Sequence, residues 1–272
     1  MTTLADVREA VETLWPPERA EAWDAVGLIA GEPDAPVQRI LLAVDAVLET
    51  SQEALEVEAD LLLVHHPLLL RGVNSVAADT PKGRIVTDLI RGGVALLAAH
   101  TNADIVERGT SAELAARIGL EHTEPIVPNA ADRELGLGRV GLLPEELPLG
   151  ALARTLAQRL PSTATGIRVA GEYDRPVRRV AICGGAGDSL LEHQEVLRAD
   201  VYITADLRHH PASEARDRHR MGRGPALIDL SHWASEWLWL PAAARQLHES
   251  LPGVEVIVSE LRTDPWDFSV PQ

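Results

Sequence analysis

Two adjacent histidines, His65 and His66, stand inside an apolar run, LLLVHHPLLL at residues 61–70. A buried imidazole needs partners for its ring nitrogens, and an unpaired buried polar group costs about 1–3 kcal/mol. Core hydrogen bonds to the backbone would satisfy the rings, and so would a metal ion. Side chains adjacent on a strand point to opposite faces, and Pro67 ends the strand. If metal is bound, we therefore expect the two histidines to splay toward two neighbouring ions.

Further side chains that can bind metal follow other apolar segments. Asp45 ends the segment RILLAVD, His100 and Asp104 belong to HTNAD after VALLAA, and His232 and Glu236 follow PALIDLS. Each of these residues alone has an ordinary explanation as a helix cap, a turn residue or a core polar group. His232 and Glu236 are four residues apart on a predicted helix, a spacing that suits metal ligands and also arises by chance.

The elements that must position these residues alternate along the chain. Apolar strands are predicted at 39–45, 60–66 and 94–100, and helices at 49–59, 83–93 and 110–120. Continuous apolar strands alternating with helices predict an α/β fold with a mostly parallel sheet covered by helices. Because ligands gather outside the carboxyl ends of parallel strands, we expect the candidate residues to share one edge of the sheet.

A second α/β unit is predicted after about residue 121, with strands at 178–185 and 200–206. The last block contains a strand before His232, a helix, and a strand within 254–261. We expect this whole block to return to the first sheet. The sequence therefore predicts two interlinked α/β domains: a metal-binding domain of residues 1–124 plus 225–272, and an inserted second domain of residues 125–224.

Charge and composition exclude several classes of protein. Lys and Arg total 25 against 41 Asp and Glu, and the formal charge of −16 disfavours nucleic acid and anionic membranes as partners. The sequence contains no apolar run near the length of about 18 residues that a membrane span needs, and its acidic start is unlike a signal peptide. We expect a cytoplasmic protein. With a single cysteine, Cys183, a metal site must use His, Asp and Glu.

Five motifs occur in an order that resembles the NIF3-like proteins, also labelled GTP cyclohydrolase 1 type 2 homologues. They are HHP at 65–67, AAHTNAD at 98–104, AICGGAGDSL at 181–190, YITADLRHH at 202–210 and HWASE at 232–236. The segment WDAVGLIAGEP at 23–33 extends the resemblance over nearly the whole chain. Two positions depart from the expected pattern, with Ala205 in place of glycine and Ala25 in place of asparagine. Either change would alter the rim of the pocket but not a ligand.

The resemblance implies a ligand set and an assembly. It implies two divalent metal ions per chain, bound by His65, His66, Asp104, His232 and Glu236. It also implies that the second domain is inserted within the first, in a toroidal homohexamer. The chain is short, so it resembles the compact members of the family that lack an additional inserted domain.

Five protein ligands are too few to saturate two ions, so solvent would complete the coordination. An open position is typical of catalytic sites, where a divalent ion lowers the pKa of bound water to about 7. This indicates a metal-dependent hydrolase, and the resemblance implies attack of a metal hydroxide on a nucleotide such as GTP or a related phosphorylated metabolite. His100 would be an extra ligand or would orient one. Asp45 is the weaker candidate for a catalytic role. Zn, Fe, Mn, Co and Ni all suit these donors.

An alternative function is a non-catalytic scaffold that binds or delivers metal through protein partners. The absence of an obvious basic cradle for a phosphorylated substrate favours it, since the local cations are Arg71, Lys82, Arg84 and Arg208. The second HHP, at 209–211, is interpreted as pocket-lining or as a polar helix start rather than a metal centre. The glycine-rich stretch CGGAGDS matches no phosphate-binding pattern and is interpreted as a turn.

Overall fold

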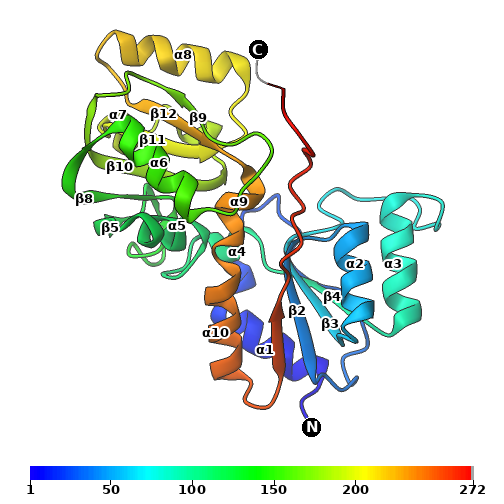
Figure 1. Ribbon diagram of the computed structural model, residues 1–272. Coiled ribbons are helices and arrows are strands. Elements are labelled where there is room, and N and C mark those ends of the chain that lie inside the picture. Colours follow the sequence, from blue (N-terminus) through cyan, green and yellow to red (C-terminus); the bar gives the residue numbers. More distant parts are fainter. Residues whose placement is uncertain (271–272) are drawn as a thin grey trace. The chain divides into compact units, whose positions relative to one another are not determined.

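The structure, a computed structural model, describes residues 1–270 and contains two compact units. The first comprises residues 1–103 and 240–263, and the second comprises residues 104–239 and the segment from 264 onward. Each unit has its own main sheet with helices packed against it (Figure 1). The predicted α/β class is confirmed. Within residues 1–270, no helix is both long and apolar enough to cross a bilayer.

The first unit contains a five-stranded sheet in which β1 runs antiparallel to β4 and the other neighbours run parallel. In spatial order the strands are β1 (Gly27–Ala30), β4 (Ala95–Ala98), β3 (Leu61–His66), β2 (Arg39–Asp45) and β13 (Glu255–Val258). The inner strands are buried on both faces, which explains why they appear in the sequence as unbroken apolar runs.

Helices cover both faces of this sheet (Figure 1). They are α1 (Leu4–Leu14), α2 (Leu48–Glu56), α3 (Pro81–Gly92) and α10 (Leu240–Ser250), with a 3₁₀ turn at Pro17–Arg19 and the short α4 (Thr101–Asp104) after β4. α2 and α3 bury Ala54, Ile85 and Leu89 against the strands on one face. Thr80 caps α3, with its hydroxyl accepting a hydrogen bond from the Gly83 N–H, and the left-handed Gly93 follows the last residue of the helix.

The second unit contains a six-stranded mixed sheet and a small two-stranded one. The main sheet has the order β5 (Glu121–Glu124), β8 (Arg139–Pro148), β10 (Pro176–Ala186), β11 (Val201–Ala205), β12 (Ala226–Leu230) and β9 (Arg168–Ala170). β10, β11 and β12 are parallel, and the outer strands are antiparallel. The small sheet pairs β6 (Val127–Pro128) with β7 (Gly136–Leu137).

Alternate residues of the central strands of this sheet enter two cores. Val180 and Ile182 pack on the side that holds Leu114, whereas Ala181 and Cys183 pack on the other side. The helices of the unit are α5 (Thr110–Ile118), α6 (Leu149–Arg159), α7 (Gln194–Leu197), α8 (His209–Arg220) and α9 (His232–Trp237), with a 3₁₀ turn at Asp188–Leu190. Helix α9 carries His232 and Glu236 at its two ends.

The prediction that the whole last block returns to the first sheet is wrong for β12. This strand pairs in parallel with β11, with Val201 opposite Ala226, and antiparallel with β9. Helix α8 makes a short crossover from β11 to its neighbour, which is the usual connection between adjacent parallel strands. The chain returns to the first sheet later, with α10 and β13. His232 therefore follows a strand of the second sheet and does not share a sheet edge with His65.

The second unit extends beyond the predicted inserted domain, residues 125–224, in both directions. Its main segment begins at Asp104 because α5 packs on β10, and this segment ends at Trp239 because α9 packs on β10 and β11. The predicted metal-binding domain, 1–124 plus 225–272, is thus divided differently in the structure. Which domain carries a metal-binding role stays a prediction.

Candidate metal centre

Three histidines cluster at the carboxyl ends of two neighbouring strands of the first unit. His65 and His66 end β3, and His100 follows β4, which pairs in parallel with β3 through Val64 and Ala98. Each histidine offers a ring nitrogen, and these three nitrogens all lie within 4.8 Å of one another. The ring centroids are 5.0–5.4 Å apart. Although His65 and His66 are adjacent on a strand, their ring nitrogens lie close together. The three nitrogens are near enough to bind one ion or two neighbouring ions.

Each of these imidazoles is held at Nδ1 by an oxygen that accepts a hydrogen bond. The distances are 2.9 Å from His65 to the Ala99 carbonyl, 2.7 Å from His66 to Asp45 Oδ1, and 2.9 Å from His100 to Asp24 Oδ1. A carbonyl or a carboxylate only accepts, so Nδ1 carries the proton and Nε2 carries the lone pair. This arrangement fixes the tautomer and the ring direction that metal-binding histidines need. The donor chemistry therefore fits a divalent metal ion.

Asp24 is a buried carboxylate that orients His100. It accepts hydrogen bonds from the Thr101 N–H at 3.0 Å, the Thr101 hydroxyl at 2.5 Å and the Ala25 N–H at 2.7 Å. Burial by itself would raise the pKa of Asp24. The hydrogen bonds from His100 and Thr101 outweigh this effect and hold the pKa well below its usual range. Asp24 was not singled out in the sequence. Its only signal there was the segment WDAVGLIAGEP, because its partner lies 76 residues later.

Asp45 has a comparable position beside His66. Its second oxygen accepts a hydrogen bond from the Thr263 hydroxyl, so both carboxylate oxygens have partners. Asp45 also faces His66 across the parallel pairing of β2 and β3. The structure thus places Asp45 where it orients a candidate ligand.

The second unit contributes a histidine and a glutamate on one face of α9. Ser231 caps this helix, with its hydroxyl accepting from the Ala234 N–H at 3.2 Å. His232 Nε2 lies 3.1 Å from Glu236 Oε1, and His232 Nδ1 lies 2.7 Å from Asp206 Oδ2. Burial lowers the pKa of His232, but the two carboxylates outweigh this effect and raise it to about 11. A divalent cation facing Glu236 would take the place of the proton on Nε2.

Asp206 is held in an uncommon backbone conformation next to this pair. It directly follows β11 and has φ +57°, a left-handed conformation that costs non-glycine residues energy and that Asp and Asn adopt more readily than most. Its carboxylate meets His232 in the same way that Asp24 meets His100.

Gly185, at an irregularity in the pairing near the end of β10, makes room for Glu236. Gly185 has φ +67°, and a Cβ built there would lie 2.3 Å from Glu236 Oε1 and 3.2 Å from His232 Nε2. Its N–H donates to the Ser235 hydroxyl at 2.9 Å. The prediction that CGGAGDS forms a turn is wrong for its first four residues, which belong to β10; the chain leaves the strand at Gly187 and enters the 3₁₀ turn at Asp188–Leu190. The close approach of Glu236 explains why residue 185 is glycine.

Asp104 is the last residue of α4 and belongs to the second unit. Its Oδ1 accepts a hydrogen bond from the Thr110 hydroxyl at 2.5 Å, at the start of α5. Burial, together with the negative charges of Asp104 and Glu236, raises the pKa of the Cys183 thiol to about 12. The carboxylates of Asp104 and Glu236 are thus both near enough to Cys183 to influence the pKa of its thiol.

Two of the arginines considered for a phosphate have acidic partners. Arg84 lies 3.8 Å from Asp88, and Arg208 lies 2.6 Å from Asp188.

The second HHP begins α8, and His209 lines a pocket, which confirms its interpretation as a pocket-lining helix start.

Comparison with known proteins identifies the family. The chain belongs to the Duf34/NIF3 (NGG1p interacting factor 3) family, whose model matches residues 2–265. A Streptomyces coelicolor protein named "GTP cyclohydrolase 1 type 2 homolog" is 50% identical, over 99% of this chain and 95% of that protein. The resemblance inferred from the motifs is thereby confirmed.

More distant relatives extend the comparison. A Mycobacterium tuberculosis protein of the same name is 35% identical, over 97% of each chain. Its alignment spans 375 positions, more than the 272 residues here, so this relative has residues without a counterpart in the present chain. The fold matches a hypothetical protein of Staphylococcus aureus, with a TM-score of 0.89, 27% identity and coverage of 98% and 99%. A NIF3-related protein of Bacillus cereus has a TM-score of 0.90 at 24% identity, with the same coverage.

Proposed function

We propose that this protein is a dinuclear metal-dependent hydrolase that acts on a nucleotide or a related phosphorylated metabolite. The observation that supports it most is the cluster of three imidazoles, whose nitrogens lie within 4.8 Å of one another and whose Nδ1 atoms are held by oxygens. Such second contacts are typical of metal-binding histidines. Imidazole and carboxylate donors together suit Zn, Fe, Mn, Co or Ni.

The proposed ligands come from both units: His65, His66, Asp104, His232 and Glu236, with His100 as an additional donor. The chain passes from one unit to the other inside α4, where His100 and Asp104 are four residues apart. The connecting segment thus carries one candidate ligand of each unit.

The residues of the chain have two tasks in this proposal. The ligands hold the ions and leave positions for solvent and substrate, while Asp24, Asp45 and Asp206 keep the imidazoles directed at the site. The ions, when bound, would supply Lewis acidity and lower the pKa of water, which is the usual basis of hydrolysis at such centres. The name of the relatives makes GTP the first substrate to test. We also propose a cytoplasmic homo-oligomer, a hexamer by family resemblance.

The test begins with bound metal per chain, measured by elemental analysis of metal-replete protein. We expect two ions, and a value near one would contradict the dinuclear proposal. The protein loaded with Zn, Mn, Fe or Co is then assayed on GTP and a panel of phosphoesters. We expect turnover that His65→Ala and Glu236→Ala abolish. His248→Ala changes an exposed histidine near the end of α10 and serves as the control.

Failure of catalysis has a defined meaning. If every metal form binds two ions but none turns over any substrate, the hydrolase proposal is wrong. Turnover that both ligand variants leave unchanged would also contradict it. The alternative, a scaffold that binds or delivers metal, is supported by the first of these results.

A further inference from the structure

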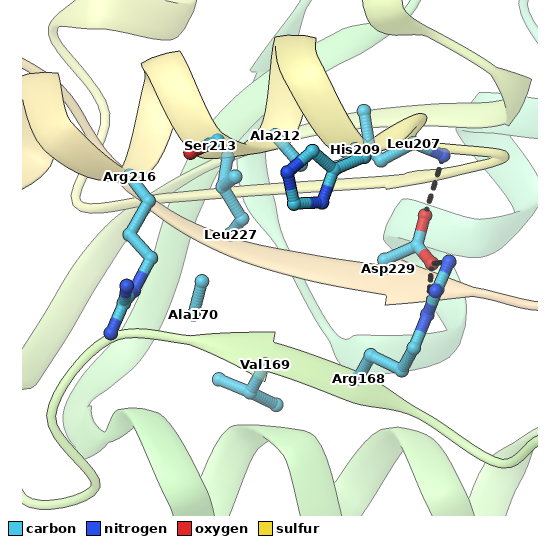
Figure 2. Close-up of a pocket in the computed structure, with 10 residues that line it drawn as sticks. All are labelled: Arg168, Val169, Ala170, Leu207, His209, Ala212, Ser213, Arg216, Leu227 and Asp229. Atoms are coloured by element: carbon cyan, nitrogen blue, oxygen red, sulfur yellow. Dashed lines mark hydrogen bonds and ion pairs between the residues drawn. The ribbon is translucent and has the colours of Figure 1, made fainter.

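The second unit contains a cavity of about 390 Å³ that shares no lining residue with the candidate metal centre. It lies between one face of α8 and the strands β9 and β12, as Figure 2 shows. Its volume is within the range of small-molecule sites, about 300–1,000 Å³. The cavity is therefore large enough for a small organic ligand.

The floor of the cavity is apolar. Leu207 and Leu227 line it and are themselves buried in the unit, and Ala170 of β9 lies near Leu227 (Figure 2). On α8 the lining residues include Ala212 and Arg216, four residues apart on the same helical face. Small and aliphatic side chains here leave a surface on which a flat apolar group can lie.

The charged groups around this floor favour an anion. Arg168 and Arg216 stand at opposite ends of the cavity in Figure 2. Asp229 is the acidic residue of the lining, and both of its oxygens have partners: Oδ2 accepts from Arg168 Nε at 2.8 Å, and Oδ1 accepts from the Leu207 N–H at 2.9 Å. Its charge is thus balanced by Arg168, and the second arginine remains in excess.

Arg216 is the group that a ligand would meet. It is exposed, and within residues 1–270 it forms no ion pair shorter than 4 Å. The first turn of α8 borders the same cavity at His209, where the helix dipole adds partial positive charge. A locally positive cavity is unexpected on a chain with a formal charge of −16.

We propose that this cavity binds a small organic anion with a flat apolar body, such as an aromatic carboxylate or phosphate monoester. The anionic group pairs with Arg216, and the body lies on the floor formed by Leu227 and Ala170. Guanidinium groups suit both kinds of anion because they offer a planar set of donors. This site does not depend on the proposed hydrolase function.

Isothermal titration calorimetry of the full-length protein tests the proposal, with benzoate and phenyl phosphate as probes. The measurements are made with and without a chelator, so that binding at a metal centre is recognised. We expect at least one of the two probes to bind with one site per chain, and the comparison of the two identifies the preferred anion. Arg216→Ala should weaken its binding about tenfold, which corresponds to the loss of one charge-assisted hydrogen bond.

Arg220→Ala is the matched control, because Arg220 is exposed on the same helix and does not line the cavity. It should change the affinity less than twofold. The proposal is wrong if neither probe binds, or if the two arginine variants behave alike. Inorganic phosphate that binds as tightly as phenyl phosphate would contradict the role of the apolar floor. Benzyl alcohol that binds as tightly as benzoate would contradict the role of charge.

Discussion

His232 and Asp206 are joined by a contact of 2.7 Å between Nδ1 and Oδ2, and Asp206 adopts a left-handed backbone, φ +57°, directly after β11. Strained backbone is retained where the surrounding structure needs it, and here the carboxylate orients an imidazole that also faces Glu236. The same arrangement recurs at His66 with Asp45 and at His100 with Asp24, so orientation by carboxylates is a common feature of the candidate ligands.

The first prediction concerns this contact. Asp206→Ala removes the group that orients His232, and we expect metal affinity to fall about 10–100-fold, the usual effect of losing such a contact. Asp206→Asn is the matched control, because Asn tolerates the left-handed conformation and can still accept the Nδ1 hydrogen bond. Competition with a chromogenic chelator measures both affinities. If both variants lost the same amount of metal affinity, the hydrogen bond from His232 Nδ1 to residue 206 would not be the cause of the loss.

The second prediction concerns Gly185, the residue of β10 that Glu236 approaches closely. Gly185→Ala places a Cβ 2.3 Å from Glu236 Oε1, so the carboxylate must move, and we expect less metal per chain and a lower melting temperature. Gly184→Ala is the control, since its Cβ would meet its nearest atom at 3.5 Å, an ordinary contact. Elemental analysis and thermal unfolding of the two variants provide the comparison. Retention of full metal content by Gly185→Ala would contradict the proposed role of Glu236.

Much of the fold could be predicted from the sequence because its parallel strands are unbroken apolar runs. The predicted strand 39–45 coincides with β2, and β3 begins one residue later than predicted. The strand before His232 was also recognised, but its sheet was assigned wrongly. An apolar run shows that a strand is buried on both faces. It does not show which strands lie next to it, because that depends on pairing between segments far apart in the sequence.

The candidate site was predictable to a similar degree. His65, His66 and His100 are brought together as neighbouring strand ends require, and a parallel pairing explains why. Asp24 and Gly185 could not be assigned from composition or spacing. Their roles depend on a hydrogen bond across 76 residues and on space beside a carboxylate, and neither leaves a periodic pattern in the sequence.

The third prediction is a pH dependence that arises from Cys183. Burial, together with the negative charges of Asp104 and Glu236, raises the pKa of this thiol to about 12, against about 8.5 in an unfolded chain. Above about pH 8.5 the unfolded state loses this proton while the native state keeps it, so stability falls as pH rises toward 12. The thiol contributes a slope of at most about 1.4 kcal/mol per pH unit.

Cys183→Ala removes that contribution, whereas the other alkaline groups, including Tyr202, remain in both proteins. Urea unfolding at pH 7.5, 9 and 10 should therefore show a smaller loss of stability in the variant than in the parent protein. The same slope in the two proteins would mean that the thiol is not protected in the native state.

The fourth prediction concerns metal removal. An ion that binds the folded protein and not the unfolded chain stabilises it by about 2.7 kcal/mol when its concentration is 100 times the dissociation constant. We therefore expect a chelator to lower the melting temperature, and added Zn or Mn to restore it. His65→Ala should abolish the restoration by metal, because His65 offers one of the three clustered nitrogens. His248→Ala changes an exposed histidine and should respond to metal like the parent protein. A melting temperature that metal shifts equally in both variants would exclude His65 as a ligand, whatever the outcome of the activity assays.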